Sequence, residues 1–125
     1  MNVRIYYEDT DAAGIVYYAN YLKFCERARS ELFFSNGIAP QSEYGYFVVK
    51  HIEANYIKSA KLGDILTIKT EMLEKKSVSI LLLQKVFKDE LLLFEMKIRL
   101  AFLKDGKPVK IPSKINSLLS IWQNR

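Results

Sequence analysis

The chain has 125 residues, of which half are apolar and 13% aromatic, and its formal net charge is +5. This length fits a single domain, residues 1–125, and the apolar content excludes a disordered chain. No run of about 18 apolar residues is present, which excludes a membrane-spanning helix. The first residues lack the basic and apolar regions of a secretory signal, and Cys25 is the only cysteine. We therefore expect a cytoplasmic protein without an intrachain disulfide.

The positive charge, with a pI of about 9.3, predicts an anionic partner. Nucleic acid, a membrane surface and a phosphate-bearing small molecule all qualify, and a host that makes lysine-rich proteins explains the charge equally well. The lysines are spread along the chain, with only Lys75 and Lys76 adjacent, and no nucleic-acid recognition motif accompanies them. We expect no nucleic-acid partner.

The first expected element is a short strand over residues 2–7, NVRIYY. An acidic segment follows at residues 8–11, and the apolar period then changes to that of a helix. The residues of the expected helical face are Tyr21, Phe24, Cys25, Ala28 and Leu32. With Asn20 as the N-cap and Gly37 beyond its end, one helix is predicted over residues 20–36.

Four longer strands joined by tight turns are expected next, over residues 47–57, 65–73, 78–87 and 91–103. In the last of these, every second residue from Leu92 to Phe102 is apolar, and the charged residues Glu95, Lys97 and Arg99 lie on the other face. Asp105 and Gly106 predict a hairpin turn that leads into a short strand over residues 109–111. The strands therefore belong to one antiparallel sheet.

A final short helix is expected after Pro112, with Ile115, Leu118, Leu119 and Trp122 on one side. The element order describes an α+β domain. Its sheet has to curl around the helix at residues 20–36, because no other long helix is available to cover the apolar strand faces. The outer face of the sheet is expected to carry Val78, Ile80 and Leu82, which a second subunit would bury.

The sequence contains no nucleotide-binding loop, zinc-ligand spacing or nucleophile elbow. His51 lies in an expected strand and Cys25 on the apolar helix face, so both are interpreted as structural residues. Asp9 and Asp11 remain, close to Gly14. One interpretation is turn formation and favourable charge at a helix start. The other is a carboxylate beside free backbone N–H groups, which polarise a carbonyl while the carboxylate attacks it or activates water.

Residues 7–29, YEDTDAAGIVYYANYLKFCERAR, resemble the signature of hotdog-fold thioesterases, in particular the YbgC-type acyl-CoA thioesterases and 4-hydroxybenzoyl-CoA thioesterase. The residues that match the signature are Asp9, Asp11, Gly14, Tyr17, Asn20, Tyr21, Glu26, Ala28 and Arg29. Residues 60–66, AKLGDIL, resemble a second and shorter motif of the family. The resemblance implies a hotdog fold, in which an antiparallel sheet wraps around one long central α-helix, and the expected element order agrees with it.

The resemblance implies that the protein hydrolyses acyl-CoA to a free fatty acid and CoA. By position, Asp11 matches the catalytic carboxylate, which acts as nucleophile or general base. Gly14 matches the loop glycine, and Tyr18 the residue at the helix start whose backbone N–H contacts the thioester oxygen. Tyr7 is close enough in sequence to orient water or substrate. Many YbgC-type sequences have histidine at the position of Tyr18; a phenol is a poor base at neutral pH, so the chemistry is assigned to Asp11 and the backbone N–H.

Further implications concern ligands and subunits. Lys75 and Lys76 match a basic stretch near the coenzyme A phosphates, although a solvated strand end explains them equally well. A homodimer or homotetramer with active sites at the subunit interface is implied, with no metal and no cofactor apart from the coenzyme A of the substrate. Three alternatives stay open: an acyl carrier protein thioesterase, a hotdog dehydratase, and a non-catalytic scaffold for acyl carriers or lipid-synthesis enzymes. The dehydratases resemble a histidine-based site, and His51, the only histidine, is far from the acidic segment in the sequence.

Overall fold

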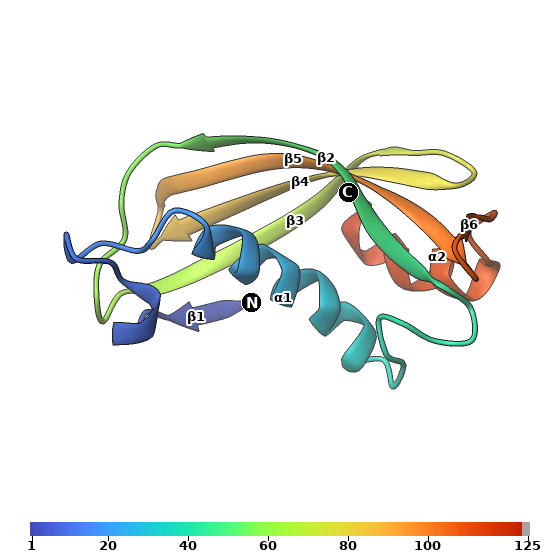
Figure 1. The fold of residues 1–125 in the computed structure, drawn as a ribbon, viewed down its shortest axis with the longest axis horizontal. Helices are drawn as coiled ribbons and strands as arrows, with labels where there is room; N and C mark the ends of the chain where they lie inside the picture. Colours follow the sequence, from blue (N-terminus) through green and yellow to red (C-terminus); the bar gives the residue numbers. More distant parts are fainter. Residues whose placement is uncertain (124–125) are drawn as a thin grey trace.

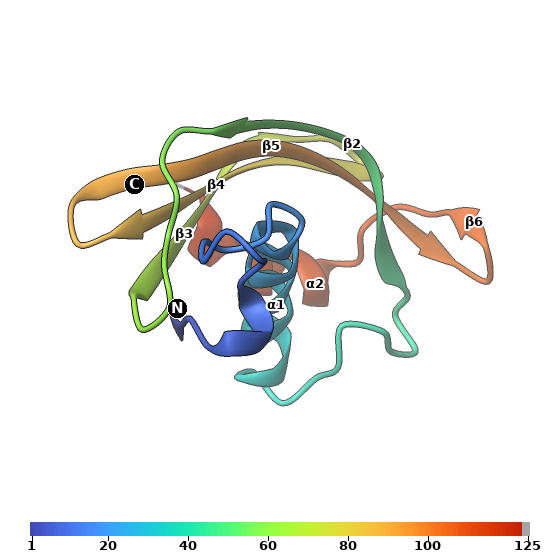
Figure 2. The same ribbon diagram turned by 60° about the vertical axis from the view of Figure 1, so that its left-hand side comes forward.

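One antiparallel sheet curves around one long helix in the computed structural model, which describes residues 1–123 (Figures 1 and 2). The elements are β1 (Asn2–Arg4), a 3₁₀ turn (Tyr7–Asp9), α1 (Asn20–Phe34), β2 (Tyr46–Tyr56), β3 (Ile65–Lys75), β4 (Ser79–Lys88), β5 (Leu91–Lys104), β6 (Lys107–Pro108), α2 (Ser113–Leu119) and a second 3₁₀ turn (Ser120–Trp122). The strand order is β1-β3-β4-β5-β2, with β6 added to β5. The expected architecture is confirmed.

The concave face of the sheet and one face of α1 form the core. Alternate residues of β4 point toward α1 and are fully buried: Ile80, Leu82, Gln84 and Val86. From α1 the buried side chains are Asn20, Tyr21, Phe24, Cys25, Leu32 and Phe33. The ring of Tyr21 stacks on Phe94 of β5 with the ring centroids 5.0 Å apart. The helical periodicity and the strand alternation read from the sequence thus produce one shared core.

Gln84 is a polar side chain buried between the sheet and α1. Its amide nitrogen donates to the Cys25 carbonyl oxygen and to Thr70 Oγ1, both at 3.0 Å. Its amide oxygen accepts a 2.9 Å hydrogen bond from Arg29. Because a buried amide is costly unless it is hydrogen-bonded, these contacts fasten α1 in one position against β3 and β4.

The assignment of Ile80 and Leu82 to the outer face of the sheet is wrong. Both side chains are fully buried against α1, and the half-buried Leu81 and Leu83 take the outer face. Val78 lies before β4 and is 37% exposed. Residues 80–83 are all apolar, so they show no alternation from which the register could be read.

In the first third of the chain, the structure shifts three expected boundaries. The first strand ends at Arg4, because the chain then turns and Tyr6 N–H donates to the Asp9 carboxylate at 2.9 Å. Asn20 is not the N-cap, since Ala19 takes that position and the Asn20 amide donates to the Asp9 carbonyl oxygen. The helix ends at Phe34, two residues earlier than expected.

In the last third, the register of β5 changes opposite β4, so that Leu93 rather than Leu92 is buried. The hairpin turn at Asp105 and Gly106 is confirmed, with φ angles of +53° and +78°. The short strand after it is Lys107–Pro108 rather than residues 109–111. These differences follow from a bulge and a turn, which alternation alone does not reveal.

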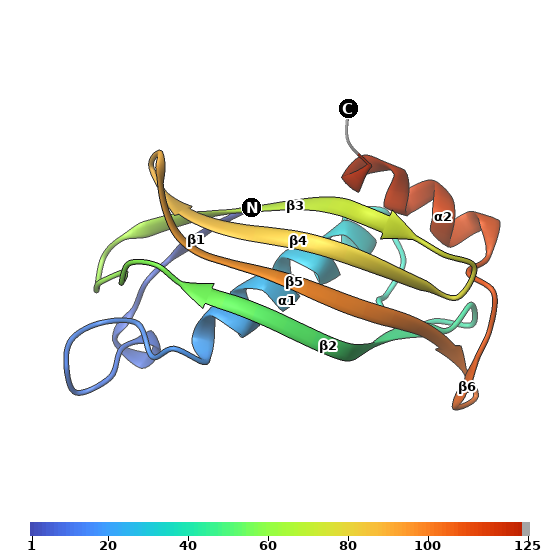
Figure 3. The same ribbon diagram turned by 90° about the horizontal axis from the view of Figure 1, so that it is seen from above.

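The final helix is confirmed. α2 follows Pro112, and the buried side chains of this segment are Ile115, Leu119 and Trp122. Figures 1 and 3 show α2 beside one end of the sheet, with the loop that precedes α1 at the other end. Within residues 1–123, no helix is both long and apolar enough to cross a membrane.

Gly45, just before β2, packs closely against the end of β5. Its φ is +127°, and a methyl group there would overlap the Leu103 carbonyl oxygen and lie 2.8 Å from the Phe102 ring. Gly45→Ala should lower the free energy of unfolding by about 2–5 kcal/mol through strain and overpacking. Gly37→Ala is the control, since its φ is +76° but its surroundings are open, and it should cost about 1 kcal/mol. Equal losses in denaturant unfolding would contradict the predicted clash.

Candidate active site

Asp11 lies in a tight loop between the 3₁₀ turn and α1. Its N–H donates to the Ile15 carbonyl oxygen and its own carbonyl oxygen accepts the Gly14 N–H, both at 2.9 Å. Its carboxylate oxygen Oδ1 accepts the Ala13 N–H at 2.9 Å. Gly14 has a φ of +81°, which a glycine adopts without strain. These bonds hold the Asp11 carboxylate in the loop by one oxygen.

The other oxygen, Oδ2, accepts no hydrogen bond from residues 1–123. Asp11 lines a cleft of about 310 Å³ that is open to solvent. The other lining residues are Ile15, Val16, Tyr18, Tyr21, Tyr56, Ile57, Lys58 and Ser59. A carboxylate with one anchored and one uncommitted oxygen is suited to accept a proton or to attack an electrophile at this cleft.

The start of α1 lies at the same cleft. The backbone N–H groups of Tyr18 and Ala19 have no acceptor in the described part of the chain. The Tyr56 hydroxyl donates to the Tyr18 carbonyl oxygen at 3.0 Å, which holds the peptide that enters the helix. Unpaired N–H groups and the positive end of the helix dipole favour an oxygen that carries negative charge. The cleft therefore combines a carboxylate with backbone N–H donors that can bind an oxygen atom.

Asp9 has a different environment. Its carboxylate oxygen Oδ2 accepts the Tyr6 N–H at 2.9 Å, and its carbonyl oxygen accepts the Tyr17 N–H at 3.0 Å and the Asn20 amide at 2.9 Å. Asp9 does not line the cleft. Turn formation, one of the two interpretations left open by the sequence, therefore describes Asp9.

Three tyrosines around the cleft are held protonated. A hydrogen bond with the Tyr18 side chain is the main cause that raises the pKa of Tyr17. Burial raises the pKa of Tyr21 and of Tyr56. At neutral pH these phenols donate hydrogen bonds and do not act as bases. Among the groups that line the cleft, Asp11 is the carboxylate that can take a proton.

Comparison with known proteins identifies the family. The model of the thioesterase superfamily matches residues 13–95. The chain belongs to the thioesterase superfamily. Acyl-CoA thioesterase YbgC of Helicobacter pylori (strain J99) is 39% identical over 96% of this chain and 98% of that protein. Acyl-CoA thioesterase YbgC of Haemophilus influenzae is 40% identical over 92% of this chain and 89% of that protein.

A solved structure, a probable thioesterase from Bartonella henselae, shares the fold with a TM-score of 0.79. It is 35% identical and covers 90% of this chain and 96% of its own. The hotdog fold and the resemblance to YbgC-type thioesterases, both expected from the sequence, are thereby confirmed.

The remaining residues proposed from the thioesterase resemblance are not brought to this cleft within one chain. Tyr7 is 82% exposed, and its carbonyl oxygen accepts the Thr10 N–H and hydroxyl. Lys75 is the last residue of β3, and Lys76 comes directly after it. Because β3 is about 33 Å long, both lysines lie at the end of the sheet opposite Asp11 (Figure 3). The Lys76 ammonium lies 3.7 Å from the Glu74 carboxylate.

Of the residues that line the cleft, Asp11 and Tyr18 were proposed from the sequence, and four others lie outside the signature segment: Tyr56, Ile57, Lys58 and Ser59. They run on from the last residue of β2, 48 residues after the acidic segment at residues 8–11, so no local pattern connects them with it. His51, earlier in β2, is exposed and lies 3.4 Å from Glu53 on the surface. In residues 1–123 no group of His, Cys, Asp or Glu could hold a metal ion.

The interpretation of Cys25 as a core residue is confirmed, since its side chain is fully buried. Burial raises the pKa of its thiol to about 12, against a smaller opposing effect of Arg29. Because the thiolate is the reactive form, we expect iodoacetamide to leave Cys25 unmodified in the native protein at pH 8 and to label it after unfolding. Mass spectrometry before and after denaturation measures this, and rapid labelling of the folded protein would contradict the buried position.

Proposed function

We propose that this thioesterase hydrolyses acyl-CoA to a free fatty acid and coenzyme A. The observation that carries the proposal is the cleft shared by the uncommitted Asp11 oxygen and the unpaired N–H groups at the start of α1. The names of the two YbgC relatives support the substrate class. The net charge of +5 suits a substrate that carries several phosphates at one end.

In the proposed mechanism, the thioester carbonyl oxygen accepts a hydrogen bond from the Tyr18 N–H. Negative charge develops on this oxygen when its carbon is attacked, and the N–H and the helix dipole stabilise that charge. Asp11 either removes a proton from the attacking water or attacks the carbon itself, forming a mixed anhydride that water then opens. The carbon–sulfur bond breaks in both routes, and the coenzyme A sulfur leaves and takes up a proton.

The tyrosine at position 18 is compatible with this mechanism. Every residue except proline supplies a backbone N–H, so the proposed contact does not depend on the side chain. The Tyr18 ring is 62% exposed, with its centroid 4.9 Å from that of Tyr17 and 6.1 Å from that of Tyr56. These rings form an aromatic wall beside the reacting group.

The central prediction concerns Asp11→Asn. Because the amide cannot accept a proton from water or attack the thioester efficiently, thiol release from acyl-CoA should fall by about 10²–10⁴-fold. Glu8→Gln is the control: it removes one negative charge from the same segment but lies outside the cleft, and its activity should match the wild type. The assay uses short-chain, medium-chain, long-chain and aromatic acyl-CoAs. The wild-type rate should also fall at acid pH, since the carboxylate must be ionised.

Other outcomes separate the alternatives. If folded Asp11→Asn is as active as the wild type, the proposed role of Asp11 is wrong. If the wild type cleaves no acyl-CoA but releases the acyl group from acyl carrier protein, the substrate assignment is wrong and the carrier protein is the partner. If neither ester is cleaved, the non-catalytic scaffold is the better description.

A homodimer formed along β2 is part of the proposal. β2 has 11 residues and lies last in the strand order, so one of its edges has no strand beside it in residues 1–123. A long free edge is a template for pairing with another chain. Beside it, α1 and β2 border a largely apolar cleft of about 420 Å³ that includes Leu22, Val49 and Ile52. A second copy would cover this surface.

The dimer would also bear on the active site. Tyr56, at the end of β2, lines the cleft that contains Asp11, so a partner along β2 would lie next to the substrate. Lys75 and Lys76 can serve the coenzyme A phosphates only from another subunit, because their own chain carries them to the opposite end of the sheet. A homotetramer would bring a further set of such lysines.

Val49→Lys tests the dimer. Val49 is 50% exposed at the free edge, and a lysine there would place a charge in the proposed interface. Light scattering after size-exclusion chromatography should give the wild type at least twice the chain mass of 14.5 kDa and the variant a lower mass. Leu91→Lys puts the same charge on an exposed apolar residue outside β2, at the β4–β5 turn, and should leave the mass unchanged. A monomeric wild type would exclude the dimer.

A further inference from the structure

The loop of Asp11 is attached to the turn that connects β2 to β3. We call residues 11–16 the acid loop and residues 60–64 the AKLGD turn. Ile15 pairs with Lys61 in an isolated bridge. Val16 N–H donates to the Ala60 carbonyl oxygen at 2.9 Å. The position of the acid loop therefore depends on the position of the AKLGD turn.

The same turn is attached to the helix and to the start of the chain. The Tyr21 hydroxyl accepts the Ala60 N–H at 3.1 Å, within the first turns of α1. On the other side, Arg4 donates to the Gly63 carbonyl oxygen at 3.1 Å, and Ile5 N–H donates to the Asp64 carbonyl oxygen at 2.9 Å. The AKLGD turn is thus bonded both to the acid loop and to Tyr21 near the start of α1.

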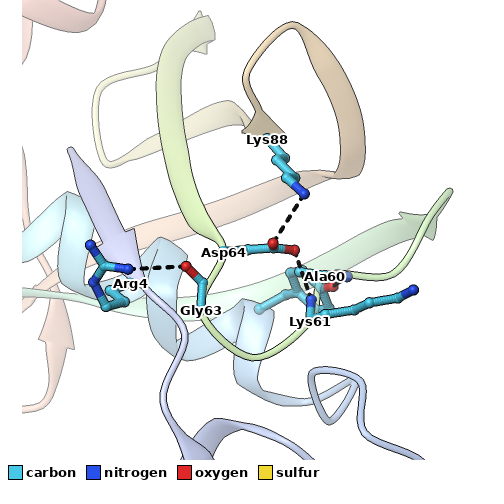
Figure 4. Close-up of polar contacts among 7 residues, drawn as sticks. Arg4, Ala60, Lys61, Gly63, Asp64 and Lys88 are labelled. Atoms are coloured by element: carbon cyan, nitrogen blue, oxygen red, sulfur yellow. Dashed lines mark hydrogen bonds and ion pairs between the residues drawn. The ribbon is translucent and has the colours of Figure 1, made fainter.

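Asp64 closes this turn with its side chain, as Figure 4 shows. Its oxygen Oδ2 accepts the Lys61 N–H at 2.8 Å, and Oδ1 lies 3.0 Å from the ammonium of Lys88. Lys88 is the last residue of β4, so the ion pair ties the turn to the neighbouring hairpin. Gly63 has a φ of +88°, which permits the sharp turn before Asp64.

The charge on Asp64 strengthens both contacts. Burial opposes ionisation of the carboxyl group, but the Lys61 N–H and the Lys88 ammonium outweigh it and lower its pKa. The side chain of Asp64 is 15% exposed, whereas that of Lys88 is 47% exposed. Hydrogen bonds to an ionised acceptor are shorter and stronger than neutral ones. The ionised carboxylate is therefore the form that holds the turn.

We propose that Asp64, supported by Lys88, is a positioning residue for the proposed thioesterase reaction: it fixes the AKLGD turn and so sets the place of Asp11 relative to the start of α1. Neither Asp64 nor Lys88 lines the cleft, so neither is a catalytic residue. The inference rests on the proposed function in assigning the chemistry to Asp11. A displacement of about 1 Å at a reacting group can cost 10²-fold in rate, so a remote support of this kind affects turnover.

The kinetic test uses variants that preserve size. Asp64→Asn keeps an oxygen that can accept the Lys61 N–H but loses the charge, and Lys88→Gln removes the charge from the other side. We expect kcat to fall by about 10-fold in Asp64→Asn and by less in Lys88→Gln, with KM nearly unchanged because the cleft keeps its lining. The double variant should lose no more than Asp64→Asn alone, because the two charges act as one pair.

Asp89→Asn is the matched control. It makes the same chemical change on the residue after Lys88, and in residues 1–123 its side chain forms no hydrogen bond or ion pair with the AKLGD turn. Its kcat should equal that of the wild type. A general loss of stability would lower the folded fraction of the variants, but it would leave kcat per folded molecule unchanged. It would also leave Lys88→Gln with its own effect when it is added to Asp64→Asn.

Amide hydrogen exchange gives a second readout that needs no substrate. In Asp64→Asn, the N–H groups of Val16 and Asp11 should exchange faster, since the acid loop loses its fixed support, while those of β4 stay protected. Unchanged exchange in the acid loop would overturn the inference. Faster exchange with unchanged kcat per folded molecule would also overturn it.

The two proposals fail in different ways. If the wild type cleaves no thioester, the proposed function is wrong. Asp64 then has no reaction for which to position Asp11, whatever the hydrogen exchange shows. If the wild type is active, Asp11→Asn is inactive and Asp64→Asn retains full kcat, the proposed function stands and the positioning role is wrong.

Discussion

A single helix has to cover the concave face of a single sheet, and the rest of the structure depends on this constraint. The contacts that satisfy it are specific: Tyr21 stacks on Phe94, and the buried Gln84 amide bonds to Cys25 and Arg29 of the helix. Because these contacts fix α1 in rotation and position, they also fix where its first N–H groups point. The core thus sets the position of these N–H donors before any substrate arrives, and the proposed stabilisation of charge on the thioester oxygen depends on that.

The acid loop has no such core of its own. Residues 11–14 are exposed, and Val16 is the first buried side chain after them. Such a segment can hold a carboxylate in one place only through hydrogen bonds and contacts to firmer elements. Those contacts run to Ala60 and Lys61, and the ion pair of Asp64 fixes this turn in its place. The site therefore has two parts. Core packing holds the start of α1, whereas hydrogen bonds and the ion pair of Asp64 hold the acid loop.

The sequence was informative wherever the pattern was local. The alternation from Phe94 to Phe102, the apolar face of α1 and the turn at Asp105 each depend on neighbouring residues, and each was found. The register of residues 80–83 was not predicted correctly, because four consecutive apolar residues fit both faces of a sheet. The sequence predicted part of the cleft. Asp11 and Tyr18 belong to one motif, whereas Tyr56 lies far from them in the sequence and is brought to the cleft by the path of β2.

The hydrogen bonds of Asp9 and Asp11, the two aspartates before α1, distinguish their roles. Turn formation and catalysis were competing interpretations of the same segment: turn formation describes Asp9, and the proposed catalysis rests on Asp11. Asp9 directs its carboxylate to the Tyr6 N–H and its carbonyl oxygen to Tyr17 and Asn20, so its polar groups are occupied in shaping the loop. Asp11 keeps one oxygen uncommitted, and it shares the cleft with Tyr18, whose N–H has no acceptor in the described residues. Asp11 and Tyr18 are exposed and both line the cleft, so their free acceptor and donor are open to a ligand, as the proposed mechanism requires.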